Sequence, residues 1–342
     1  MMKIALDAHG GDFGLKPNVE AAIRAVKELD VEIILVGRRK EIIQEINFCG
    51  YKTLHSSIHI ADCKDIIEMD REAVEECRSK PDSSIMVGTK LVAEKKADAF
   101  ISAGNSGAVM VASLLNIGRI KGVVRPAIAV LLPTEKGYSL LLDAGANMDS
   151  RPIHLLQFAI MGSVYMKNWC NIKNPKVSIL SIGEEETKGN NLVLETIPLL
   201  KNCNIINYIG TIEGRDIPTG AADVVVCDGF IGNIVLKLSE GLTKTLLTFI
   251  KNEIGNNLVN KIGALILKKV FRKIKRKTNP DEIGGAPLLG INGVVLVSHG
   301  RSNSYAIFNA IKNAKNICEK RFIEKIKFEI ENAMKNTQLE EV

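Results

Sequence analysis

MKIALDAHGGD, residues 2–12, is a short run of apolar residues that ends in a glycine-rich loop. A helical pattern, Pro17–Leu29, and a second apolar run, Glu32–Gly37, come directly after it. Strand, loop, helix and strand in this order form the unit from which helix-covered parallel sheets are built. The beginning of the chain therefore predicts an α/β fold, with ligand-binding groups in the loop that follows the strand.

The same alternation continues along the chain. Further strands are expected at residues 97–103, 176–182, 206–211, 222–228 and 294–298, and further helices at residues 84–95, 154–169 and 303–332. Two more apolar runs, 127–132 and 138–143, flank the turn residues 133–137 and are expected to pair as an antiparallel hairpin. We expect a mostly parallel sheet, with helices on both faces, in a single domain that spans residues 1–342.

Composition excludes several classes of protein. The 342 residues are 46 % hydrophobic and 25 % charged, which is typical of a globular chain with a substantial core. No segment reaches the roughly 18 consecutive apolar residues that a membrane-spanning helix needs, and Met1–Asp7 does not resemble a secretory signal. Seven dispersed cysteines without a C-x-x-C pair predict neither a disulfide framework nor a structural zinc site. We expect a cytoplasmic protein.

One segment carries most of the positive charge. The chain has a net charge of +6, but residues 244–277 alone contribute +9 and the remainder −3. Within residues 239–278, Ile254, Leu258, Ile262 and further apolar residues recur every three or four positions, which predicts a protruding hairpin of two helices with a turn at Gly255-Asn256-Asn257.

This hairpin has apolar and basic positions side by side. The candidate contact residues are Leu265, Ile266, Lys268, Lys269, Arg272 and Lys273. An ordinary amphipathic hairpin would pack its apolar face on the body or on a twin subunit and leave its lysines in water. Alternatively, the charge density suits contact with an anionic surface.

The loops that follow the expected strands share one composition. Seven of them combine glycine with Asn, Asp or a cation: residues 7–12, 104–107, 143–147, 183–190, 213–216, 228–233 and 299–303. Glycine lets a backbone approach a ligand closely, and a helix that starts next adds free N–H groups. Any single loop of this kind is more often a structural turn, but their repetition predicts a phosphate-binding site.

Several catalytic motifs are missing. The sequence has no G-x-S-x-G, no G-x-x-x-x-G-K-[ST], no H-E-x-x-H, and no G-x-G-x-x-G after the first strand. These absences disfavour a serine hydrolase, a P-loop kinase, a zinc peptidase and a standard dinucleotide-binding enzyme. We expect no metal and no cofactor, and no nucleic-acid partner.

In their order along the chain, these loops resemble the bacterial phosphate acyltransferase family. The resemblance rests on residues 7–12, 102–108, 142–147, 188–190, 213–218, 227–233, 284–290 and 299–303. His9 stands where the family commonly has Met, and Ser106 where it commonly has Thr. The first difference argues against an essential catalytic role for His9.

The resemblance implies a Rossmann-like three-layer α/β/α sandwich, usually in a homodimer. It implies transfer of a long fatty acyl chain from acyl carrier protein to inorganic phosphate. The acyl phosphate would then serve a membrane glycerol-3-phosphate acyltransferase, and the protein would lie in the cytoplasm or at the inner face of the membrane. Phosphate is already an anionic nucleophile, so this reaction needs no activated serine or metal hydroxide.

Site residues follow from the loops and the implied reaction. We assign catalytic roles to Lys188, Asn190, Asp228 and Asn233: Lys188 offsets charge, the two asparagines donate hydrogen bonds, and Asp228 orients donors or accepts a proton. The remaining residues expected to bind phosphate or substrate are Gly10, Gly11, Asp12, Asn105, Ser106, Gly107, Asn147, Arg215 and His299.

Three other functions remain open at this point. A short-chain acyl-CoA phosphotransacetylase would use similar phosphate loops but would gain little from a basic hairpin. An isocitrate-type dehydrogenase would need a dinucleotide and usually a divalent metal. A non-catalytic scaffold at the membrane would leave the polar strand-end loops without a role.

Overall fold

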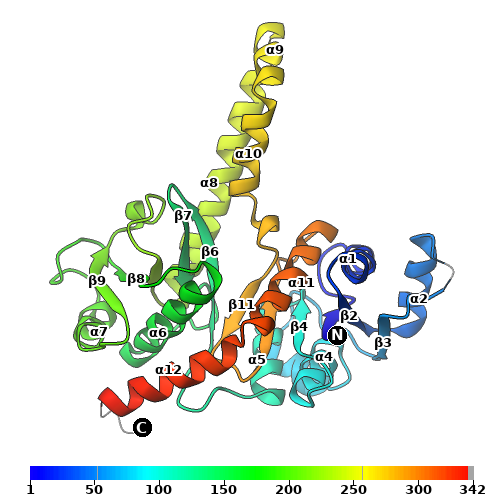
Figure 1. Ribbon diagram of the computed structural model, residues 1–342, viewed down its shortest axis with the longest axis horizontal. Coiled ribbons are helices and arrows are strands. Elements are labelled where there is room, and N and C mark those ends of the chain that lie inside the picture. Colours follow the sequence, from blue (N-terminus) through cyan, green and yellow to red (C-terminus); the bar gives the residue numbers. More distant parts are fainter. Residues whose placement is uncertain (52, 256, 338–342) are drawn as a thin grey trace.

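The strands of the computed structural model, which describes residues 1–51, 53–255 and 257–337, form two sheets (Figure 1). The first has the order β3 (Ile58–Asp62), β2 (Val31–Gly37), β1 (Met2–Asp7), β4 (Ala99–Ser102), β12 (Val294–Val297), β11 (Ala286–Leu289) and β5 (Ala127–Ile128). The second has the order β6 (Val130–Thr134), β7 (Gly137–Leu142), β10 (Val224–Val226), β8 (Lys176–Leu180) and β9 (Asn207–Ile212).

Both sheets are mostly parallel, which confirms the predicted α/β class. Antiparallel pairing occurs where β11 meets β12 and β5, and in the β6–β7 hairpin that the sequence predicted. The division into two sheets was not predicted. The apolar run 127–132 serves both of them, because β5 pairs with β11 in the first sheet whereas β6 pairs with β7 in the second.

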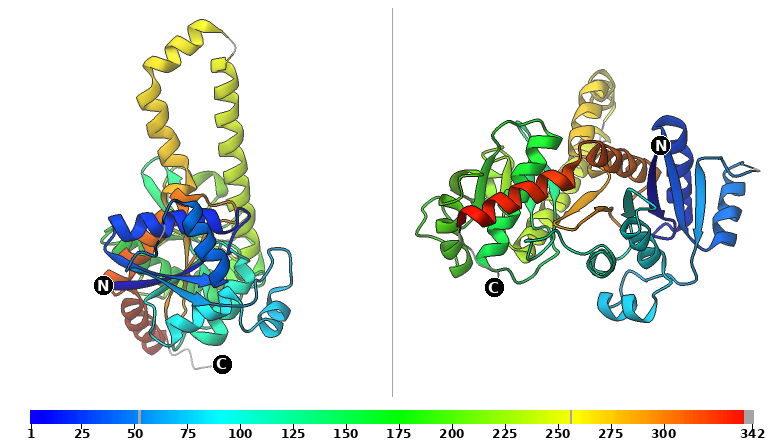
Figure 2. Two further views of the ribbon diagram at one scale, coloured as in Figure 1. Left: turned by 90° about the vertical axis from the view of Figure 1, so that its right-hand side faces the viewer. Right: turned by 60° about the horizontal axis from the view of Figure 1, so that its bottom comes forward.

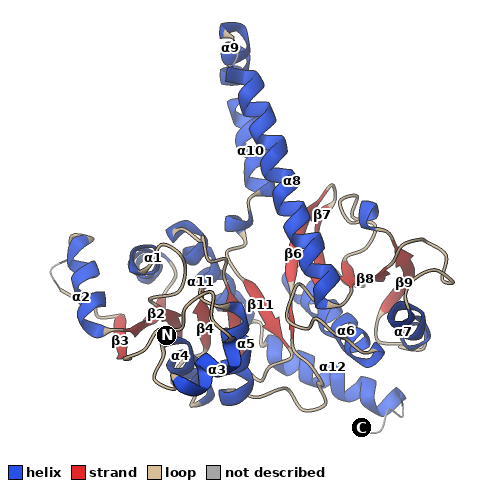
Figure 3. Ribbon diagram, turned by 180° about the vertical axis from the view of Figure 1, so that it is seen from behind, coloured by secondary structure: helices blue, strands red, loops and turns tan. Residues whose placement is uncertain are grey.

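Helices connect the strands and cover the sheets (Figures 1 and 3). They are α1 (Leu15–Glu28), α2 (Arg39–Phe48), α3 (Ala73–Ser79), α4 (Ser84–Ala93), α5 (Ser106–Asn116), α6 (Pro152–Trp169), α7 (Asn191–Lys201), α8 (Gly229–Gly255), α9 (Leu258–Ile266), α10 (Lys268–Thr278), α11 (Ser304–Glu319) and α12 (Phe322–Thr337). The sequence predicted α1, α4 and α6 within two residues, and Ser83 caps α4 as expected. The expected helix 303–332 is broken at Arg321, whose φ is 49°.

Alternating side chains place the first sheet between two helical layers. Ile4 and Leu6 belong to the same buried cluster as residues of α1 and α11, whereas Ala5 packs in a second cluster with residues of α4 and α5. Successive residues of a strand face opposite sides, so two apolar faces require two covers. The second sheet is covered in the same way by α6 and α7 on one face and by the beginning of α8 on the other.

The predicted helical hairpin is present as an arm that projects from the body (Figures 1 and 2). It consists of the distal half of α8 together with α9 and α10. The expected turn is centred on Asn256, which lies outside the described residues; α8 ends at Gly255 and α9 begins at Leu258. A second break, at Leu267, separates α9 from α10 and was not predicted. No helix in the described part of the chain is long and apolar enough to span a bilayer.

Candidate active site

A buried aspartate organises the loop after β1. Asp7 is 1 % exposed and accepts hydrogen bonds from the Ser102 hydroxyl, at 2.7 Å, and from the His9 backbone N–H, at 3.1 Å. The Ser102 oxygen in turn accepts from the Gly104 N–H. A Cβ on Gly10 would lie 2.8 Å from an Asp7 oxygen and from the Gly104 nitrogen, so only glycine fits there. The loops after β1 and β4 are thus locked together.

The loop after β12 contacts the loops after β1 and β4, and we call these three loops the first group. The Asp12 N–H donates to the Gly300 carbonyl, and the Arg301 guanidinium lies 3.6 Å from the Asp12 carboxylate. His299 is exposed, and its Nδ1 accepts from the Arg301 N–H. Gly10, Gly11, Asp12 and His299, expected in one site, therefore lie in loops that contact one another.

The amino end of α5 borders this group. Asn105 caps the helix through a hydrogen bond from the Ala108 N–H, and its side-chain amide nitrogen lies within 3.3 Å of the carbonyl oxygens of residues 68, 69 and 71. The Asn105 side chain thus holds a neighbouring loop in place. Ser106 and Gly107 occupy the first turn, and none of the hydrogen bonds found within residues 1–51, 53–255 and 257–337 uses their N–H groups. Free N–H groups at a helix start suit an anion.

A second buried aspartate, Asp143, organises the loop after β7. Its two oxygens accept from the backbone N–H groups of residues 128, 145, 146 and 147 and from the side-chain amide of Asn147. Asn147 also donates to the Pro126 carbonyl at 2.7 Å. Five donors converge on a carboxylate that is fully buried, so the loop 143–147 has one well-determined conformation.

The start of α8 packs directly on the loop 143–147, and we call this loop and the start of α8 the second group. Asp228 caps α8 by accepting from the Ile231 N–H, and the Gly229 N–H donates to the Asn147 carbonyl. A Cβ on Gly232 would lie 1.8 Å from the Asp143 carbonyl oxygen, which leaves no room for a side chain. The half-buried Asn233 side chain lies against Gly145, because a Cβ added to Gly145 would be 3.5 Å from the Asn233 side chain. Within the described residues the Asn233 amide makes no hydrogen bond.

The two groups of loops approach each other beside β5, although the strands of the second sheet run opposite to β12, because β6 continues β5 and is antiparallel to β7. Strand β11 is antiparallel to both β12 and β5, so β5 runs parallel to β12 and their carboxyl ends share an edge. Asp143 accepts from Ile128, the last residue of β5, which ties the second group to that edge. The ends of β12 and β5 are two strand spacings apart, roughly 10 Å. Figure 3 shows β11 between these two halves of the structure.

Three predicted site residues lie in loops after β8 and β9, further from β7 than Asp228 and Asn233: Lys188, Asn190 and Arg215. The Lys188 ammonium pairs with Glu185 at 2.9 Å, and Asn190 caps α7 through the Val193 N–H. Arg215 is 72 % exposed and contacts Glu213. It follows β9, three strands away from β7, so the structure does not bring it next to Asn233.

Burial sets the protonation behaviour of this region. Loss of water raises the pKa of Asp7 and of Asp143, and the hydrogen bonds that each receives act in the opposite direction. His9 is also buried, which lowers its pKa, and its Nε2 accepts from the Arg38 N–H. His9 is therefore engaged in joining two strand ends.

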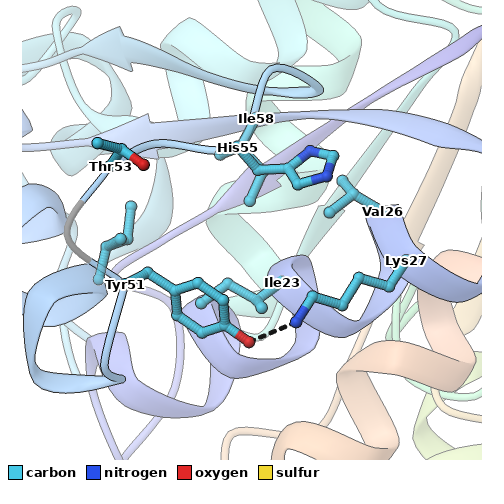
Figure 4. Close-up of a pocket in the computed structure, with 8 residues that line it drawn as sticks. Ile23, Val26, Lys27, Tyr51, Thr53, His55 and Ile58 are labelled. Atoms are coloured by element: carbon cyan, nitrogen blue, oxygen red, sulfur yellow. Dashed lines mark hydrogen bonds between the residues drawn. The ribbon is translucent and has the colours of Figure 1, made fainter.

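Two surface cavities lie away from these loops. One, of about 10 Å³, is lined by residues of α1 and of the segment before β3, including Lys27, which donates to Tyr51 (Figure 4). Its volume would admit about one water molecule. The other, of about 480 Å³, lies at the amino ends of β7, β8 and β10, the opposite edge from the loops. Neither contains a predicted site residue.

Sequence reasoning missed the residues that shape the loops. Ser102 and Asp143 were seen only as parts of motifs, and Asn18, whose amide donates to the carbonyls of Ala8, Gly10 and Gly14, was not noticed. A carboxylate at or directly after the last residue of a strand was the available signal, because Asp7 ends β1 and Asp143 follows β7.

The sequence is similar to proteins of one known family. A model of the family described as "Fatty acid synthesis protein" matches residues 2–325. The chain belongs to this family. Curated relatives named "Phosphate acyltransferase" include that of Elusimicrobium minutum, 52 % identical over 95 % of both chains, and that of Desulfitobacterium hafniense, 49 % identical over 96 % of this chain and 98 % of the relative. The resemblance noted from the loops is confirmed.

Solved structures are similar in fold. A phosphotransacetylase, EutD, from Staphylococcus aureus superposes with a TM-score of 0.59 at 17 % identity, covering 92 % of this chain and 94 % of that one. A phosphotransacetylase from Streptococcus pyogenes gives 0.58 at 19 % identity over 96 % and 94 %. At such identities the likeness concerns the α/β fold alone.

Proposed function

We propose that this protein transfers a long-chain fatty acyl group from acyl carrier protein to inorganic phosphate. Membership of the family and the name of its relatives, at about half identity over nearly the whole chain, support acyl transfer to phosphate. The observation that carries the proposal is structural. Polar loops from two sheets, held by the buried Asp7 and Asp143, approach each other beside β5, and in the described part of the chain no serine or cysteine side chain is hydrogen-bonded to a histidine.

The reaction needs positioning more than activation. An oxygen of HPO₄²⁻ attacks the thioester carbonyl carbon, the C–S bond breaks, and the departing thiolate takes up the proton that phosphate brought. The products are acyl phosphate and the free thiol, so atoms and charge balance without an added base. Holding two reactants in an attacking geometry and stabilising the transient oxyanion supply most of such a rate enhancement.

The strand-end loops provide the groups for both tasks. The first turn of α5, with the hydroxyl of Ser106 and the N–H of Gly107, suits the phosphate. Asn233, beside Gly145, suits the developing oxyanion, and Asp143 keeps the loop that faces it rigid. Lys188 would have to leave Glu185 to reach a ligand, so its role is to offset charge at the margin.

A direct assay tests the proposal. Purified protein is supplied with long-chain acyl carrier protein and phosphate, and acyl phosphate is trapped as its hydroxamate, with and without EDTA. We expect phosphate-dependent product that chelation does not change. Absence of product, or product that depends on a metal, would overturn the proposal.

A short-chain acyl-CoA phosphotransacetylase is the second candidate, and the fold of the phosphotransacetylases favours it. The preferred donor distinguishes the two. A higher kcat/KM with acetyl-CoA than with long-chain acyl carrier protein would decide for the second candidate.

We further propose that the arm binds an anionic membrane surface from the cytoplasmic side. Leu265 and Ile266 at its end are 68 % and 78 % exposed, and the six residues from Lys268 to Lys273 include four cations. Apolar side chains beside lysines fit lipid chains beside anionic headgroups. In that position the enzyme would deliver acyl phosphate to a membrane glycerol-3-phosphate acyltransferase. Pairing of two arms in a homodimer is the competing use of the same apolar face.

A further inference from the structure

A patch of unpaired cations lies beside the second group of loops. We call Arg119, Lys121, Arg125 and Arg151 the junction patch. All four side chains are exposed, and no ion pair of theirs occurs in the described part of the chain. Residues 99–134 contain no Asp or Glu, and in the adjoining loop Asp149 is the one acid between Ala144 and Arg151. About half of the other cations on the body, such as Arg24 and Arg38, have an acidic partner in the described part of the chain.

The junction patch is held rigidly. Gln157 of α6 accepts from the Val124 N–H and donates to the Gly122 carbonyl. The Arg119 guanidinium donates to the Val124 carbonyl. These bonds fix the course of a segment without regular secondary structure, which runs between the two halves of the structure (Figure 2, right). A preformed cationic surface loses little entropy when a partner docks.

Its position links it to the reaction. Pro126, one residue after Arg125, accepts from the Asn147 amide, which also holds Asp143. Arg151 follows the same loop and precedes α6. The positive charges of Arg125 and Arg151 both lower the pKa of His154, so both arginines lie near that histidine. Two large apolar side chains are exposed near these positions in the sequence, Leu115 at 62 % and Met148 at 53 %.

The basic arm is placed differently. Helix α8 starts at the carboxyl end of β10 and runs back along the sheet, so its distal half emerges past the amino ends of the strands (Figure 1). With 27 residues it is about 40 Å long. A protein bound at the tip of the arm would therefore lie away from the loops after β7 and β10. The base of α10 lies beside the loop after β12 instead, since Arg276 pairs with Glu282 and the Asn303 amide donates to Asp281.

We infer that the junction patch is the docking surface for the acidic carrier protein that presents the acyl thioester. The inference rests on the proposed function and adds the place where the donor binds. Unpaired cations complement an acidic protein and steer its approach, and the exposed apolar side chains supply contact area once it has docked. The arm remains free to contact lipid while the donor is bound.

Paired charge reversals test the inference. The first variant is Lys121→Glu with Arg125→Glu, neither of which makes a side-chain hydrogen bond within the described residues. The matched control is Lys269→Glu with Lys273→Glu in the arm, which changes the net charge equally. Binding of acyl carrier protein is measured by calorimetry at two salt concentrations, and KM is measured for acyl carrier protein and for phosphate.

The junction variant should weaken carrier-protein binding and raise its KM by about tenfold or more, with less salt dependence and an unchanged KM for phosphate. The arm variant should bind the carrier protein as the wild type does. Equal weakening by both variants, or weakening by the arm variant alone, would overturn the inference, and so would a wild type that does not bind. Wild-type binding without formation of acyl phosphate would instead refute the proposed function and leave the docking surface supported.

Discussion

The strand-end loops and the arm are built on opposite principles. In the loops, Asp7 and Asp143 are buried and each accepts several hydrogen bonds, and Gly10 and Gly232 leave no space for a Cβ. In the arm, Gly241 and Gly263 have no atom within 4 Å of an added Cβ, and the apolar residues Val259, Ile262 and Ile266 are between 58 % and 78 % exposed. A rigid region suits chemistry that depends on position, whereas an open amphipathic region suits a surface that adapts to a partner.

The most severe test of this contrast is Asp143→Ala. It removes the acceptor of five hydrogen bonds and leaves buried donors unsatisfied, so we expect a loss of at least about 3 kcal/mol in the free energy of unfolding. Urea denaturation measures it. Lys269→Ala in the arm serves as the control, with a change below about 0.5 kcal/mol. Similar values for the two variants would remove the distinction between the regions.

Alanine in place of glycine should have opposite effects in the two regions. Gly232→Ala forces a Cβ against the Asp143 carbonyl and should cost about 1–3 kcal/mol. Gly263→Ala, in open space within α9, should stabilise the arm by up to about 1 kcal/mol because alanine favours helix. Thermal unfolding of the pair checks the signs, and a stabilised Gly232→Ala protein would show that the loop is not tightly packed.

A smaller effect is expected from pH. Burial lowers the pKa of His154, at the start of α6, from 6.5 to about 4. The unfolded chain therefore binds a proton that the folded chain excludes, and this contribution to stability is present above pH 6.5 and is lost as the pH falls towards 4. Between pH 6.5 and 5.5 it amounts to about 1 kcal/mol. The difference in unfolding free energy between pH 6.5 and pH 5.5 should shrink in His154→Gln and persist in His59→Gln, whose ring is half exposed. An unchanged pH dependence of the unfolding free energy in His154→Gln would contradict the assignment to His154.

The arm should tolerate charge without loss of stability. Leu265→Asp combined with Ile266→Asp alters only exposed positions, so we expect a change in unfolding free energy within about 0.5 kcal/mol. Sedimentation with anionic liposomes should fall, while acyl transfer in solution continues. Retained sedimentation counts against the membrane role, and dissociation of a dimer would assign the apolar face to a twin subunit.

Local patterns predicted much of the fold and the motifs of the site. Alternating apolar runs located β1, β2, β8 and β12, and a three-to-four spacing located α1, α6 and the arm. The two sheets were missed because their separation depends on the strands with which β5 and β6 pair. The pairing of β5 with β11 is a contact between segments far apart in the sequence, which local patterns do not indicate. Motif reasoning also favoured polar side chains at loop tips. Asn105 and Asn190 were expected at a ligand, and the structure shows them capping helices, a use that has the same sequence pattern.

The proposed function requires phosphate to bind at the first turn of α5, near the ends of β12 and β5 and opposite the loops of the second sheet. Arsenate is a phosphate analogue that scatters X-rays anomalously, so a crystal soaked with it reports the position directly. We predict an anomalous peak at the first turn of α5, on the side that faces Gly145 and Asn233. A peak on the arm or in the cavity at the amino ends of β7 and β8, with none at α5, would contradict the claim.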